Sequence, residues 1–72
     1  MKYFQAVNIG RELLPVKTRY TKRDVDNVLL VSLFNPNLFN GTASVNQAKF
    51  VVKCFALEIE ADYSKYVRTI EN

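Results

Sequence analysis

The first residues of the chain alternate in a way that is typical of β-strands. Over residues 2–9, odd-numbered side chains would face one way and even-numbered side chains the other. A period of two predicts a strand. Gly10 and Arg11 follow, and a glycine in the first central position suits a type II′ hairpin turn. A second strand is then predicted over residues 13–20, where Pro15 lacks a backbone donor and favours a sheet edge or a bulge.

A helix is predicted over residues 22–34, because apolar side chains recur there at helical spacing. Thr21 stands at the position of the N-terminal cap. Asp24 follows three residues later, as in a capping box, although Glu or Gln is more usual there. Pro36 would end the helix, because the residue before a proline avoids the α region.

The same region permits a second interpretation. A turn at Asp26-Asn27 would make residues 28–34 a buried strand, since the segment is a continuous apolar run. Under either interpretation, residues 35–47 are predicted to form a loop, because asparagine, proline, glycine and serine are concentrated there.

The last third of the chain fits two structures. The high β propensity of Phe50 and its neighbours predicts a strand over residues 49–59, followed by a short C-terminal helix capped by Asp62. A period of 3.6 residues also permits one helix from 45 to 70, with a capping box at its start. We favour the strand, because one helix leaves a second apolar stripe to bury elsewhere. That stripe comprises Phe50, Cys54, Leu57 and Ala61, and the capping box comprises Ser44 and Gln47.

Together these elements predict a single small α+β domain over residues 1–72. It would contain an N-terminal β-hairpin, one helix, a further strand and a short C-terminal helix. The alternative is a small all-β barrel, in which residues 28–34 also form a strand. A chain of 72 residues buries only roughly 60% of its unfolded surface. Because 49% of its residues are hydrophobic, a homodimer is a reasonable expectation.

The composition argues against an enzyme and against a metal or other cofactor. The chain has no histidine, so the commonest general base and metal ligand are missing, and a Ser-His-Asp arrangement is impossible. Its two glycines cannot form a glycine-rich phosphate loop. The single cysteine, Cys54, lies in an apolar run and is predicted to be a small buried hydrophobe.

The apolar stretches bear on localisation. The longest of them is far shorter than the ~20 residues that span a bilayer. Polar residues come too early for the apolar region of a signal peptide. The sequence therefore predicts a cytoplasmic protein that does not contact a membrane.

Charge is distributed unevenly along the chain. Residues 1–23 hold six basic residues and one acid, a net of +5, whereas residues 24–72 hold four basic residues and six acids, a net of −2. Such asymmetry is typical of a surface that meets an anionic partner.

The predicted hairpin would collect these cations around an aromatic ring. Pairing Ile9 with Glu12 places Lys2, Phe4, Lys17 and Arg19 on one open face. Cations attract phosphates, and a ring stacks on an unpaired base for about 1–3 kcal/mol. We therefore expect a non-catalytic protein that binds nucleic acid, most plausibly single-stranded. The predicted binding residues are Lys2, Phe4, Arg11, Lys17, Arg19, Tyr20, Lys22 and Arg23.

The alternative function is a small protein-interaction module that inhibits or regulates a larger enzyme; size alone suggests a viral or plasmid origin. A C-terminal apolar stripe at helical spacing is more often core, but it would dock into a partner's groove if the last helix packs loosely. Exposure of Phe50, Leu57 or Tyr66 with burial of Phe4 would favour this alternative. An acidic run near residue 60, which would share one face of a strand, is interpreted as a solvated face or as a partner for the basic strip of a second copy. The stripe comprises Tyr63, Tyr66, Val67 and Ile70, and the acidic run comprises Glu58, Glu60 and Asp62.

Overall fold

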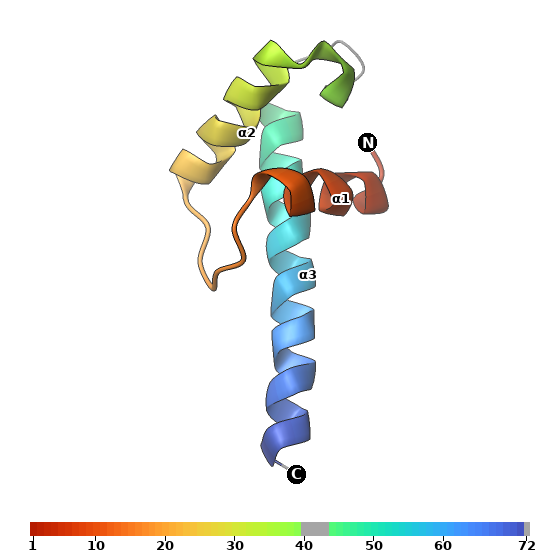
Figure 1. The fold of residues 1–72 in the computed structure, drawn as a ribbon, viewed down its shortest axis with the longest axis vertical. Coiled ribbons are helices and arrows are strands. Elements are labelled where there is room, and N and C mark those ends of the chain that lie inside the picture. Colours follow the sequence, from red (N-terminus) through yellow and green to blue (C-terminus); the bar gives the residue numbers. More distant parts are fainter. Residues whose placement is uncertain (40–43, 72) are drawn as a thin grey trace.

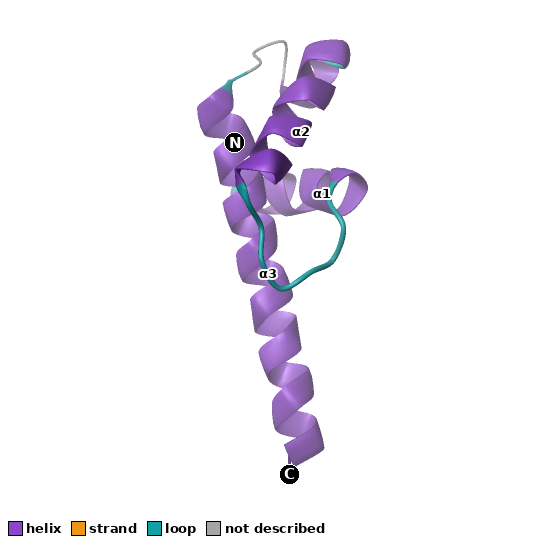
Figure 2. Ribbon diagram, turned by 90° about the vertical axis from the view of Figure 1, so that its left-hand side faces the viewer, coloured by secondary structure: helices purple, strands orange, loops and turns teal. Residues whose placement is uncertain are grey.

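The computed structural model contains three α-helices and one short 3₁₀ helix (Figure 1). It describes residues 1–39 and 44–71, with side chains for 1–35, 37–39 and 44–62. The helices are α1 (Tyr3–Leu13), α2 (Lys22–Phe34) and α3 (Val45–Glu71), and the 3₁₀ helix η1 (Pro36–Phe39) follows α2. Figure 2 shows helix and loop but no strand in the described ranges. The predicted α+β domain and the alternative β-barrel are therefore both wrong.

The long helix α3 forms the axis of the molecule. Helix α1 crosses it at a steep angle, and α2 lies against its N-terminal half (Figures 1 and 2). The C-terminal half of α3 continues well beyond both, so the molecule measures 47 × 22 × 17 Å. The protein thus has a compact body and a projecting helical end.

The core lies where the three helices meet. Phe55, Val28 and Val51 are its largest fully buried side chains. The connection between α1 and α2 adds Leu14, and η1 adds Phe39. The remaining buried apolar residues are Ala6, Val7, Ala48, Val52 and Cys54.

Helix α1 replaces the first predicted strand. Its buried residues Ala6, Val7 and Gly10 follow helical spacing, which the alternation over residues 2–9 hid. The backbone N–H of Lys2 donates to the Gln5 side-chain oxygen at 2.9 Å and so caps the first turn. Gly10 is part of the helix rather than of a hairpin turn. It lies at the crossing with α3, where a β-carbon would meet Phe55.

The second predicted strand is an irregular connection between α1 and α2. Its only side chain buried in the core is Leu14, at 7% exposure. Tyr20 fastens it: the Tyr20 hydroxyl donates to the Pro15 carbonyl at 2.6 Å and accepts from the Lys17 N–H at 3.3 Å. The Pro15 carbonyl and the Lys17 N–H are thus hydrogen-bonded without a neighbouring strand.

Helix α2 confirms the predicted helix over 22–34 and excludes a strand over 28–34. The predicted cap is also present, since the backbone N–H of Thr21 donates to the Asp24 carboxylate at 2.7 Å. Val28 and Ser32 face the core from this helix.

Helix α3 contradicts the strand predicted over 49–59 and the separate C-terminal helix. The alternative of one helix from 45 to 70 is the structure observed. A helix forms here because the segment is buried on several sides: both α1 and α2 pack against α3, and Val51, Cys54 and Phe55 are all buried. Of the second stripe only Cys54 is buried, and Phe50 and Leu57 are 36% and 49% exposed. The loop predicted over 35–47 is wrong at both ends, which η1 and the start of α3 occupy, and residues 40–43 lie outside the described part of the chain.

Candidate nucleic-acid interface

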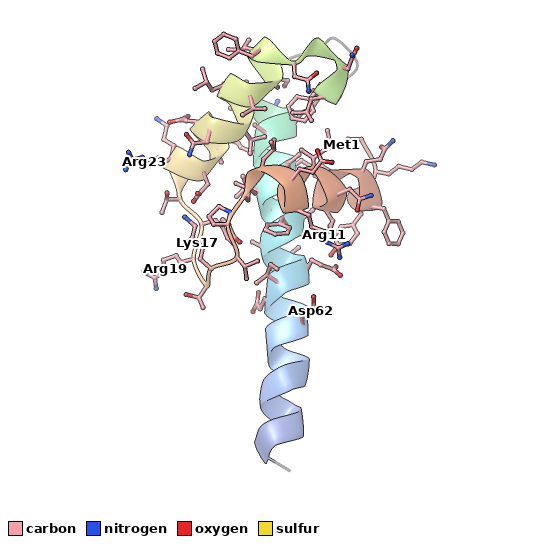
Figure 3. All side chains as sticks on the ribbon, in the orientation of Figure 1. Met1, Arg11, Lys17, Arg19, Arg23 and Asp62 are labelled. Atoms are coloured by element: carbon pink, nitrogen blue, oxygen red, sulfur yellow. The ribbon has the colours of Figure 1, made fainter. Side chains whose placement is uncertain are left out.

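The eight predicted binding residues fall on three different segments. Lys2, Phe4 and Arg11 belong to α1 or its cap, Lys17, Arg19 and Tyr20 to the connection, and Lys22 and Arg23 to the first turn of α2. In Figure 3, Lys17, Arg19 and Arg23 lie on one side of α3 and Arg11 on the other. The common face expected for Lys2, Phe4, Lys17 and Arg19 is wrong, because it depended on a hairpin that does not form.

Phe4 is exposed and packs against Tyr3, which in turn is bound to an acid. Its ring is 77% exposed and lies edge-on to Tyr3, with centroids 5.9 Å apart. The Tyr3 hydroxyl donates to a Glu58 carboxylate oxygen at 2.6 Å, and this hydrogen bond is the main reason that the pKa of Tyr3 rises to about 12. The cation–π contact found among the described side chains is that of Lys17 with Tyr20, so no cation stacks on Phe4 there.

Lys17 is already paired within the protein. Its Nζ lies 2.9 Å from Asp24 Oδ1 and 5.2 Å from the centre of the Tyr20 ring. The Thr21 N–H is the largest cause that lowers the pKa of Asp24, and Lys17 lowers it further. Asp24 therefore stays charged and neutralises Lys17, which acts as a structural contact rather than as a free cation.

Tyr20 packs against the core. It is half-buried and lies edge-on to Phe55, with ring centroids 6.0 Å apart. Its hydroxyl is occupied by the bonds to Pro15 and Lys17. Tyr20 thus holds the connection against α3, and the Phe55 ring and the Lys17 ammonium already contact its ring.

Three predicted cations remain available within five consecutive residues: Arg19, Lys22 and Arg23, which we call the basic connector. All three are exposed, and the one ion pair among the described side chains is that of Lys17 with Asp24. Lys22 and Arg23 begin α2, where unpaired backbone N–H groups add positive potential. The basic connector is therefore the strongest positive feature that the predicted set forms.

An apolar groove of about 720 Å³ lies between the connection and α3. Two exposed lysines, Lys49 and Lys53, border it from α3, and the sequence analysis missed both. Their spacing of four places them on one helix face, but this holds only if the segment is a helix. We call this feature the connector groove. Its lining residues are Val16, Lys17, Thr18, Tyr20, Val25, Lys49, Val52, Lys53, Ala56, Ile59 and Glu60.

The acidic run does not form the shared face expected of a strand. On α3, Glu60 is turned by about 200° from Glu58 and from Asp62 and points away from both, whereas Glu58 and Asp62, four residues apart, lie on nearly the same face. Glu58 is bound to Tyr3, and Glu60 borders the connector groove. No group of three or more potential metal ligands occurs in the described ranges.

Cys54 is buried, as predicted, at 3% exposure. Burial raises the pKa of its thiol, which keeps the side chain protonated and unreactive.

Comparisons with known proteins add no relative, since no family model, curated protein or solved structure matches the chain. None of the helices in the described part of the chain combines the length and the apolar character of a membrane span.

Proposed function

We propose that this protein binds nucleic acid without catalysis and that the basic connector contacts the phosphate backbone. The observation that supports the proposal is the exposure of Arg19, Lys22 and Arg23 within five consecutive residues. All three are free of ion pairs with the described side chains. Guanidinium and ammonium groups in this arrangement attract successive phosphates, and the released counterions favour binding.

The local backbone supports the same role. The Tyr20 hydroxyl bonds to Pro15, before Arg19, and the Thr21 N–H bonds to Asp24, after it. The Arg19 cation is therefore carried on a segment that is fixed on both sides. Ordering before binding reduces the entropy lost on association. Because Phe4 lies on α1 next to Tyr3 rather than beside these cations, we assign the binding energy to phosphates and not to base stacking.

Paired variants of equal charge test the proposal. Arg19→Gln/Arg23→Gln removes two cations of the basic connector, and Lys2→Gln/Arg11→Gln removes two exposed cations near α1. We expect the first variant to weaken binding to a labelled oligonucleotide by about tenfold and the second to change it little. Fluorescence anisotropy with single-stranded DNA, duplex DNA and RNA measures this. Equal losses of affinity in both variants would show that binding depends only on the net charge of the protein. Absence of binding to every probe would refute the proposal.

A second candidate function, docking on a larger protein, is supported by the outer face of α2. Leu30, Leu33 and Phe34 are 53%, 62% and 83% exposed and neighbour one another on the helix. Exposed apolar clusters of this kind mark protein contacts more often than nucleic-acid contacts. The two candidate functions use different residues, so substitutions in one surface test one function without changing the other.

The variant Leu33→Ser/Phe34→Ser tests the second candidate. Because both side chains are exposed, we expect the fold to persist by circular dichroism. Loss of a specific binding partner in pull-down from the host, with oligonucleotide binding unchanged, would support protein docking. Loss of oligonucleotide binding in this variant would show that the α2 face belongs to the nucleic-acid surface instead.

A further inference from the structure

The C-terminal half of α3 extends away from the body of the molecule. In Figures 1 and 2, neither α1 nor α2 accompanies the helix to its end at Glu71. We call residues 61–71 the stem. A helical end that neither α1 nor α2 accompanies gains little stability from helix propensity alone. A partner surface would stabilise the stem.

The stem continues the floor of the connector groove. Val52, Ala56 and Ile59 line the groove from α3 at spacings of four and three. The next positions in this series are residues 63, 66 and 70, which are Tyr63, Tyr66 and Ile70. Alternating spacings of three and four are those of the a and d positions in a coiled coil. The groove floor and the stem thus form one seam along a single helix.

We propose that a second copy of this chain occupies the groove, with the two α3 helices antiparallel and the stem of each in the groove of the other. Charge favours this direction. Residues 1–57 contain eight cations and three acids, whereas residues 58–72 contain two cations and four acids. An antiparallel pair sets the acidic end of each helix against the basic body of the other, whereas a parallel pair sets acid against acid.

The seam also defines the register. Packing Ala56 against Ile59 of the second copy combines a small residue with a large one and brings Lys53 beside Glu60 of the second copy. Both side chains are exposed and both border the groove. Twofold symmetry makes this ion pair twice. A shift by one heptad would instead place Glu60 of one copy against Glu60 of the other, and this repulsion disfavours that register.

This register also covers exposed apolar surface. Val45, at the start of α3, is 47% exposed and belongs to the same seam, seven residues before Val52. In the proposed pair it lies opposite position 70 of the second copy. Between Val45 and Val52 the seam position is Lys49, so this end of the interface is partly polar.

Charge reversal with rescue tests the proposal. We expect the wild-type protein, without nucleic acid, to sediment as a dimer at equilibrium. Lys53→Glu and Glu60→Lys should each raise the dimer dissociation constant by about tenfold, because each turns two attractive pairs into repulsive ones. The double variant Lys53→Glu/Glu60→Lys restores both attractions and should return to wild-type affinity.

Control variants carry equal charge changes away from the groove. Arg11→Glu and Glu12→Lys lie on exposed positions of α1 and should leave the dimer unchanged. Far-UV circular dichroism verifies that every variant folds. A wild-type protein that stays monomeric would overturn the proposal, and so would a double variant as weak as the single ones. Since no nucleic acid is present, neither result bears on the proposed binding function.

Discussion

At the scale of single residues, Gly10 determines how closely α1 approaches α3. A β-carbon at this position would lie 2.6 Å from Phe55 Cβ and 2.7 Å from Phe55 Cγ. The Phe55 β-carbon is fixed to its backbone and cannot rotate away. The helices must therefore separate if residue 10 has a side chain.

Gly10→Ala should consequently destabilise the protein, although the same change normally favours a helix. Overpacking costs about 1–3 kcal/mol, whereas alanine contributes roughly 0.5–1 kcal/mol in helix propensity. We expect a lower thermal midpoint, measured by circular dichroism. Asn8→Ala, at an exposed position of α1, is the control and should leave stability equal or slightly higher. A more stable Gly10→Ala variant would contradict the close crossing.

Asp24 links the start of α2 to pH. Its pKa lies below the ordinary value of 3.8, chiefly because the Thr21 N–H donates to it and also because Lys17 pairs with it. A lowered pKa in the folded state means that these contacts contribute fully above pH 3.8. Their contribution is lost as the pH falls below that value, because the folded carboxylate then takes up a proton.

Asp24→Asn should remove this part of the acid sensitivity and lower the free energy of unfolding at neutral pH by about 1 kcal/mol. Urea unfolding at several pH values measures both effects. Asp26, which is exposed on the same helix, provides the matched control. If Asp26→Asn flattened the acid profile as strongly as Asp24→Asn, the cap and the Lys17 pair would not be its source.

At the scale of elements, the sequence predicted a helix correctly where the residues that begin and end it lie within the segment itself. The helix over 22–34 was predictable because Thr21, Asp24 and Pro36 mark its ends within the segment itself. Helix α1 was not, since the role of Gly10 depends on Phe55, which is remote in sequence. An alternating segment of eight residues also contains helical spacings, and only the contact with α3 decides between them.

Helix α3 shows how burial overrides intrinsic propensity. The β propensity around Phe50 predicted a strand, but two helices pack on different sides of this segment and cover more than one stripe. A strand presents two faces, whereas a helix can be covered around much of its circumference. The number of covered sides is a tertiary property that the sequence pattern does not contain.

Backbone chemical shifts test α3 directly. We expect positive Cα secondary shifts throughout residues 49–59, as in a continuous helix. They require only an assigned NMR spectrum of the wild-type protein. A run of negative values across this segment would restore the strand and remove the floor of the connector groove.

Only part of the candidate interface was predictable from the sequence. Arg19, Lys22 and Arg23 follow from local charge and stay together, because they are close in sequence. The inclusion of Phe4 depended on a hairpin register and was lost with it. Lys17 could not be recognised as neutralised until its distance from Asp24 was known.

At the scale of the whole molecule, charge separates along α3. The basic body, residues 1–57, carries the connector, and the last part of the chain, from residue 58 on, holds four acids and two cations. The proposed nucleic-acid contacts use the outer side of the body, whereas the proposed second copy uses the groove beneath the connection. A dimer of this kind would present two basic connectors and would increase binding to a long strand through a high effective concentration.

The salt dependence of nucleic-acid binding tests the central claim most directly. We expect the affinity for a single-stranded oligonucleotide to fall linearly on a plot of log affinity against log salt concentration. The triple variant Arg19→Gln/Lys22→Gln/Arg23→Gln should reduce the magnitude of that slope by about 2–3, since each lost phosphate contact removes roughly 0.7–0.9. An unchanged slope, with or without weaker binding, would show that the basic connector does not contact the phosphates.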